Sequence, residues 1–101
     1  MLVNGAAVSG CLYLAAFVDG ADVATIEHPG NGDLDAVQRA FIECGAFQCG
    51  FCTPGFLVAA DEILRSGQRY TRDELRELLI GHICRCTGYE PIIEAVYECL
   101  G

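Results

Sequence analysis

Positive charge is scarce in this chain of 101 residues. Six Lys+Arg stand against fourteen Asp+Glu, which makes the formal net charge −8. Nucleic acid phosphates and anionic membrane surfaces repel an acidic protein, so neither is an expected partner. Long apolar runs are also missing, and none approaches the length that crosses a bilayer. No basic segment followed by an apolar one resembles a secretory signal.

Motifs of catalysis are missing as well. The chain has no recognisable nucleophile–base pair, no Gly-rich phosphate loop and no dinucleotide-binding fingerprint. We therefore expect no substrate turnover from this chain alone. The composition, 52% hydrophobic and 20% charged, excludes a disordered or fibrous protein. A domain of this size buries little interior and often adds a metal or a disulfide.

Cysteine, by contrast, is abundant, with seven residues. Their odd number and the lack of an export signal disfavour disulfides and favour ligand chemistry in a reducing cytoplasm. Four of them form a C-x2-C pair, Cys49 and Cys52, and a C-x-C pair, Cys84 and Cys86. Thiolates suit iron–sulfur clusters, zinc and copper(I). A [2Fe–2S] cluster needs two thiolates for each iron, and two close pairs supply them.

Zinc is the alternative metal, because it also accepts four thiolates in a closed tetrahedral site. The chain would then be a small zinc-stapled interaction domain without a redox role. The C-x-C half is less common in such sites, so the spacing favours the cluster. Cys44 and Cys99 fall on apolar helix faces and are expected in the core. His82 has no visible partner, and we expect it on a helix surface.

Residues 1–28 differ in pattern from the rest. Leu2 to Val8 reads as a strand, an Asn-Gly turn and a second strand. Two strands have too little core to stand alone. Residues 28–32 are rich in helix and strand breakers and form a predicted linker.

Residues 29–101 show helical periodicity, and the sequence predicts a mainly α fold here. We expect helices from Leu34 to Cys44, from near Pro54 to Ser66, from a capping box at Thr71, and from near Tyr89 to Leu100. The residues predicted to face the core are Leu34, Val37, Phe41, Cys44, Leu57, Ala60, Ile63, Leu64, Leu75, Leu78, Leu79, Ile83, Ile92, Ile93, Val96 and Leu100. Each half reads helix, cysteine pair, helix. This predicts a pseudo-two-fold four-helix bundle with both cysteine loops, and two helix N-termini, at one end.

The segment from Gly45 to Gly55, GAFQCGFCTPG, and the segment from Ile83 to Tyr89, ICRCTGY, carry a resemblance. They resemble the iron–sulfur subunit of the molybdenum hydroxylases, the family of xanthine dehydrogenase, aldehyde oxidoreductase and carbon monoxide dehydrogenase. The resemblance covers the chain from about Ser9 to its end.

This resemblance implies a two-lobed small subunit, in which a plant-ferredoxin-like lobe and a four-helix lobe hold one [2Fe–2S] cluster each. It implies that Cys49, Cys52, Cys84 and Cys86 hold the cluster of the helical lobe. Cys86 is then the ligand closest to a molybdopterin on a large subunit, with Gln48 near the same cofactor. Electrons are implied to run from molybdenum through the clusters to FAD on a medium subunit.

One departure from the family pattern concerns the first lobe. Cys11 matches that lobe's fourth ligand, although Gly10 replaces the usual serine, and the three other ligand cysteines have no counterpart here. One thiolate does not hold a cluster. We therefore expect residues 1–28 to be a remnant of the ferredoxin-like lobe plus the linker, and the chain to hold one cluster.

Overall fold

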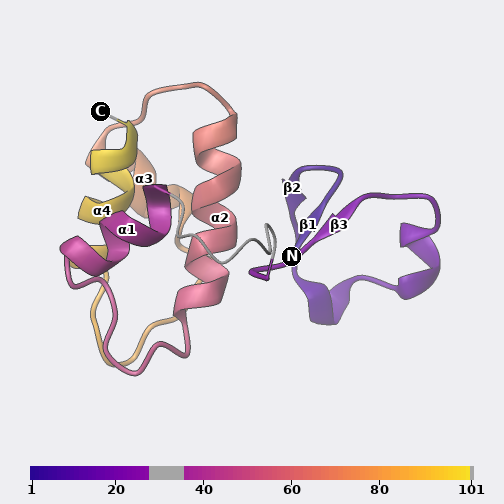
Figure 1. Cartoon of the computed structure of the whole chain (residues 1–101), viewed down its shortest axis with the longest axis horizontal. Helices are drawn as coiled ribbons and strands as arrows, with labels where there is room; N and C mark the ends of the chain where they lie inside the picture. The colour runs from indigo at the N-terminus through magenta and orange to yellow at the C-terminus, as the bar shows by residue number, and fades with distance from the viewer. Residues whose placement is uncertain (28–35, 101) are drawn as a thin grey trace.

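The computed structural model describes residues 1–27 and 36–100. Its elements in chain order are β1 (Leu2–Val3), β2 (Ala6–Ala7), two 3-10 turns (Gly10–Leu12 and Ala15–Val18), β3 (Val23–Ala24), α1 (Ala36–Glu43), α2 (Thr53–Arg65), α3 (Arg72–Leu78) and α4 (Glu90–Leu100). The fold is mainly helical, with one small sheet (Figure 1). The predicted boundary at residues 28 and 29, the linker and Leu34 lie outside the described residues.

The predicted strand, Asn-Gly turn and strand at the N-terminus are confirmed. Asn4 and Gly5 have positive φ angles of 51° and 86°, as a tight turn between twisted antiparallel strands requires. β1 pairs with β2, and its other edge pairs with β3, so the order is β2-β1-β3 and all pairs are antiparallel. We did not predict β3, because a two-residue strand is too short to show a period.

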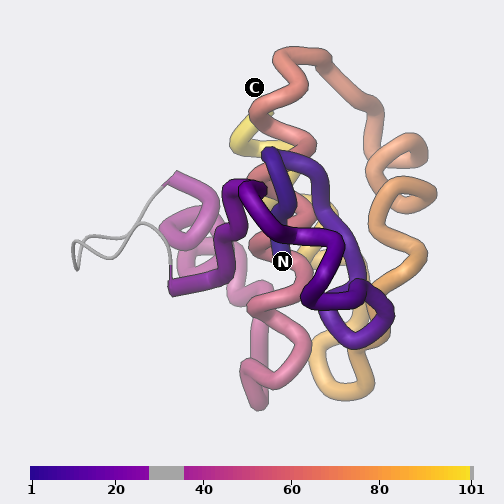
Figure 2. Tube along the Cα trace, turned by 90° about the vertical axis from the view of Figure 1, so that its right-hand side faces the viewer, coloured from indigo at the N-terminus to yellow at the C-terminus, as the bar shows by residue number. Residues whose placement is uncertain are grey.

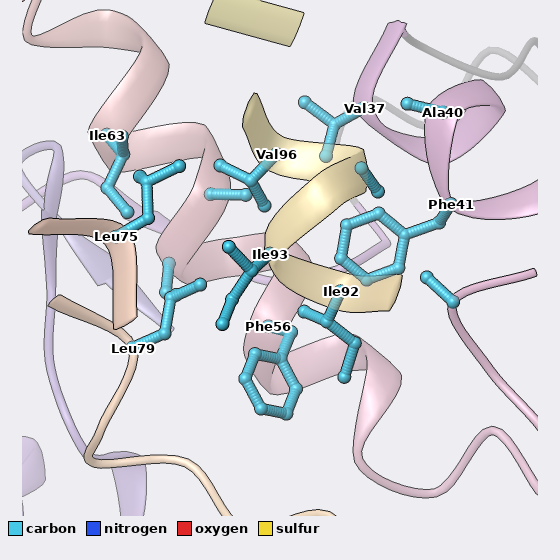
Figure 3. Close-up of a cluster of buried hydrophobic side chains, with 14 residues drawn as sticks. Val37, Ala40, Phe41, Phe56, Ile63, Leu75, Leu79, Ile92, Ile93 and Val96 are labelled. Atoms are coloured by element: carbon cyan, nitrogen blue, oxygen red, sulfur yellow. The ribbon is translucent and has the colours of Figure 1, made fainter. Parts of the chain in front are cut away.

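The core lies among the four helices, and α4 runs through its centre (Figure 3). Its largest fully buried side chains come from all four helices and are Phe41, Phe56, Leu75, Ile92 and Val96. Apolar residues at helical spacing place one face of each helix inward. No helix among the described residues is long and apolar enough to span a bilayer.

The third helix is predicted well at its start and poorly at its end. The capping box is present: Glu74 N donates to Thr71 Oγ1 and Thr71 N donates to Glu74 Oε1, both at 3.2 Å. Leu75 and Leu79 are buried, as predicted. Leu78 is 48% exposed and Ile83 is 80% exposed, so their predicted burial is wrong. The helix ends at Leu78, and the helical period therefore does not continue to Ile83.

Helix α2 lies between the sheet and the remaining helices (Figures 1 and 2). Ala7 N of β2 donates a hydrogen bond of 2.6 Å to the Glu62 carboxylate. Leu2, from β1, and Leu57, from α2, line one cavity between the two parts. The short sheet is thus held against the helix that follows the first cysteine pair.

Replacement of Leu75 by alanine tests this description of the core. The side chain is completely buried, so Leu75→Ala should lower the free energy of unfolding by about 2–5 kcal/mol. Leu78→Ala, three residues along the same helix, is the matched control and should cost far less because Leu78 is half exposed. Urea denaturation followed by circular dichroism measures both, and equal losses would contradict the assigned helix face.

Candidate metal centre

The two cysteine pairs lie in two loops at the same end of the helical part. Cys49 and Cys52 belong to the connection from α1 to α2, and Cys84 and Cys86 to the connection from α3 to α4. Figures 1 and 2 show these loops side by side at the lower end of the bundle. The predicted location of both loops at one end is therefore confirmed. No disulfide joins any of the seven cysteines, all of which lie in the described part of the chain.

The four side chains meet across the loops as two pairs. Cys52 is hydrogen-bonded to Cys84, and Cys86 is hydrogen-bonded to Cys49. Cys52 and Cys84 are half-buried, whereas Cys49 and Cys86 are exposed. Each pair therefore takes one cysteine from each loop, with one pair deeper than the other.

Within the deeper pair the two thiols differ in acidity. Burial, followed by the hydrogen bond with Cys84, raises the pKa of Cys52 to about 11. Burial also tends to raise the pKa of Cys84, but hydrogen bonds from Cys52, Thr87 and Gly88 outweigh it and lower that pKa to about 7. One of these is the Thr87 N–H, which donates to Cys84 Sγ at 3.4 Å. Cys84 thus ionises first, and the thiolate is the form that binds a metal.

In the exposed pair, the hydrogen bond with Cys49 and the charge of that neighbour raise the pKa of Cys86. Close thiols cannot all ionise without a compensating positive charge, because like charges disfavour one another. A bound cation supplies that charge and displaces the protons. The arrangement is therefore typical of a site that binds a metal cation.

The donor set fits a binuclear cluster better than a single ion. The contacts join the thiols two by two. A [2Fe–2S] cluster has two irons, and each takes two thiolates.

Backbone conformation turns both loops toward the site. Gly50 has φ 79° and Gly88 has φ 77°, in the left-handed region that other residues rarely enter. α2 begins at Thr53, directly after Cys52, and α4 begins at Glu90, four residues after Cys86. The positive ends of these helix dipoles, in the first turns, favour negative charge at this end of the bundle.

Aromatic rings join the second loop to α2. Phe56 is fully buried. The His82 ring packs against it in a tilted arrangement at a centroid distance of 4.9 Å, and the Tyr89 ring contacts it edge-on at 6.4 Å. The Tyr89 hydroxyl accepts a hydrogen bond of 3.2 Å from Cys84 N. Our expectation of a surface role for His82 on a helix is wrong, because the ring is half-buried and follows α3 in a turn. Sequence reasoning missed Phe56 and the role of Tyr89, although Tyr89 lies close to Cys84 in the chain.

The remaining candidates lie apart from these pairs. Gln48 is exposed beside Cys49. Cys44 and Cys99 pack against the core, as predicted, and donate to Glu98 at 3.4 Å and to the carbonyl of Ala36 at 3.6 Å. Cys11 is exposed in the N-terminal part, 3.4 Å from the Ser9 hydroxyl.

Comparison with known proteins decides between the metals. The family described as "[2Fe-2S] binding domain" matches residues 25–97, which include all four cysteines of the two pairs. The chain belongs to this family. A [2Fe–2S] cluster is accordingly the cofactor of this binding domain.

Similar proteins are subunits of oxidoreductases. This [2Fe–2S] binding domain is 48% identical to the nicotine 6-hydroxylase small subunit of Paenarthrobacter nicotinovorans, over all of this chain and 61% of that subunit. It is 43% identical to the xanthine dehydrogenase iron-sulfur-binding subunit of Escherichia coli O157:H7, over 98% of this chain and 64% of the relative. The chain thus spans about three fifths of the length of these relatives.

A solved structure shows the same fold. The crystal structure of quinoline 2-oxidoreductase from Pseudomonas putida 86 superposes with a TM-score of 0.90 at 42% identity, covering 98% of this chain and 62% of the other. The four helices and the small sheet are therefore the architecture of an oxidoreductase component.

Removal of the Tyr89 hydroxyl tests the anchoring of the second loop. Tyr89→Phe keeps the ring but leaves Cys84 N without its acceptor, and should lower the free energy of unfolding by about 0.5–1.5 kcal/mol. Tyr97→Phe is the control, because the Tyr97 ring lies under Arg72 on the far part of α4. Chemical denaturation compares the two variants. If Tyr89→Phe is no less stable than Tyr97→Phe, the hydrogen bond does not anchor the loop.

Proposed function

We propose that this chain is an electron-transfer [2Fe–2S] subunit of a molybdopterin-dependent hydroxylase. The observation that carries the proposal is the meeting of two thiol pairs, one cysteine from each loop, at a single end of the bundle. The similarity to iron–sulfur subunits of hydroxylases and dehydrogenases supports it. The chain itself supplies no catalytic residue.

Cys49, Cys52, Cys84 and Cys86 are the proposed ligands. The contacts suggest that Cys52 and Cys84 hold the deeper iron and that Cys49 and Cys86 hold the outer one. When bound, the cluster takes up one electron from a donor and passes it to an acceptor. The half-buried pair limits water at one side, while the exposed pair leaves the other side within reach of a partner.

The partners we propose are a large molybdopterin-binding subunit and a medium FAD-binding subunit. Cys86 and Gln48 would face the molybdopterin, and both are exposed. Apolar side chains surround them in sequence, with Phe51 93% exposed and Ile83 80% exposed. A partner that covered these side chains would exclude water from the outer iron. Electrons would then pass from reduced molybdenum, through the cluster, toward FAD, which is reduced in turn.

The substrate of such a complex would be selected outside this chain. Similar subunits come from proteins named for nicotine, xanthine and caffeine, at 48%, 43% and 42% identity. Comparable similarity across different named substrates supports an electron relay that is shared, with the specificity placed in another subunit.

The chain is proposed to consist of two parts. Residues 1–28 would be part of a ferredoxin-like lobe with its linker, and residues 29–101 the cluster-binding lobe. The order helix, cysteine pair, helix in α1–α2 and again in α3–α4 supports a pseudo-two-fold relation. The lack of disulfides among the seven cysteines supports a cytoplasmic location.

Electron paramagnetic resonance of the anaerobically purified chain tests the proposal. After dithionite reduction, we expect one rhombic half-integer spin signal, with one spin per chain, because four thiolates hold one cluster. Two distinct signals would show that a second cluster is assembled. A colourless sample that contains zinc and shows no signal would overturn the redox function.

Single cysteine replacements test the ligand assignment. Cys49→Ser, Cys52→Ser, Cys84→Ser and Cys86→Ser should each lose most of the bound iron and the visible absorbance, since each removes one of four thiolates. Cys11→Ser is the matched control at another exposed cysteine and should keep both. Iron content per chain is the measurement. A normal iron content in any of the four variants would remove that residue from the ligand set.

A further inference from the structure

Thr53 carries a buried hydroxyl for which the described part of the chain offers no hydrogen-bond partner. Among the residues described, 1–27 and 36–100, Thr53 Oγ1 is the one buried side-chain nitrogen or oxygen with no hydrogen bond. Thr53 is the first residue of α2, and the residue before it is Cys52. The unsatisfied atom therefore lies directly beside a member of the deeper thiol pair.

A buried polar atom of this kind lowers the stability of a folded protein. A buried hydroxyl without a hydrogen bond destabilises the folded state, and most buried polar groups therefore have a partner. Valine has nearly the same shape and would fill this position without that penalty. The presence of threonine here thus calls for an acceptor that residues 1–27 and 36–100 do not supply.

The surroundings narrow the choice of acceptor. Thr53 helps to line a cavity whose walls are mostly apolar and include Phe41, Phe47 and Leu57. Cys52, the residue before Thr53 in the chain, contacts Cys84 in the proposed cluster site. The acceptors in that site are sulfur atoms, which bear negative charge when an iron–sulfur cluster is bound.

We propose that the Thr53 hydroxyl donates a hydrogen bond to a sulfur atom of the bound cluster or its ligands and thereby tunes the reduction potential. The inference rests on the proposed cluster site and adds Thr53 to it as a hydrogen-bond donor. Reduction adds one electron and so increases the negative charge on the sulfurs. A hydroxyl donor stabilises the reduced state more than the oxidised state, and hydrogen bonds to sulfur are a known determinant of potential.

The matched variants are Thr53→Val, which keeps the shape and removes the donor, and Thr53→Ser, which keeps the donor. The measurement is the midpoint potential from a redox titration of the reconstituted chain, followed by electron paramagnetic resonance. We expect Thr53→Val to disfavour the reduced state about tenfold, which corresponds to a potential lower by about 59 mV for one electron. Thr53→Ser should stay near the native value, and only Thr53→Val should change the g values appreciably.

The stability of the iron-free chain is the second measurement. Without the cluster the hydroxyl has no acceptor, so Thr53→Val should be at least as stable as the native chain in chemical denaturation. With the cluster bound the order should reverse, since the variant then lacks a hydrogen bond. A merely structural role of Thr53 predicts the same order in both states.

The outcomes separate this inference from the proposed function. A native chain that binds no iron–sulfur cluster would overturn both. A native chain with a normal cluster, and a Thr53→Val variant with unchanged potential and g values, would overturn only the role of Thr53. A potential lowered equally in Thr53→Ser would also overturn it. Loss of the cluster in Thr53→Val alone, with native helical content, would support dependence on the hydroxyl.

Discussion

Phe56 provides the contact on which the geometry of the site depends. Its ring is fully buried one turn into α2, four residues after Cys52. The position of this ring therefore fixes the end of the first cysteine loop. His82 and Tyr89, which flank the second cysteine pair, both lie on this ring. One side chain therefore sets the spacing between two loops that are distant in the chain. Packing of Cys52 and Cys84 against the hydrophobic core helps to bring the thiol pairs together across the loops.

The surface charges support this packing without determining it. Arg72 makes two hydrogen bonds of 2.9 Å to the Glu94 carboxylate, and Arg76 pairs with Glu90 at 2.9 Å. Both pairs join α3 to α4, the two helices that flank the second loop. They are partly exposed, and such pairs contribute about 0–1 kcal/mol each. The buried apolar side chains thus dominate the stability of the bundle.

Much of the fold was predictable, and the donor set could be proposed, because both depend on short-range chemistry. The capping box at Thr71, the Asn4-Gly5 turn and the spacing of the two cysteine pairs each involve residues near one another in the chain. Burial of Leu78 and Ile83 was predicted wrongly. For Ile83 the reason is that periodicity does not reveal where a helix ends, and α3 ends at Leu78. The pairing of Cys52 with Cys84, and the stacking of His82 on Phe56, depend on contacts between segments far apart in sequence. Local sequence patterns do not predict such contacts.

The exposure of Cys49 and Cys86 has a consequence for the lifetime of the protein. Thiolates that reach solvent also reach dissolved oxygen, and oxidation of such sulfurs proceeds toward sulfenic acid and beyond. The openness that lets an electron cross to a neighbouring protein therefore also admits damage. A subunit built in this way would age fastest between its synthesis and its assembly, and docking would preserve the cofactor as well as connect it.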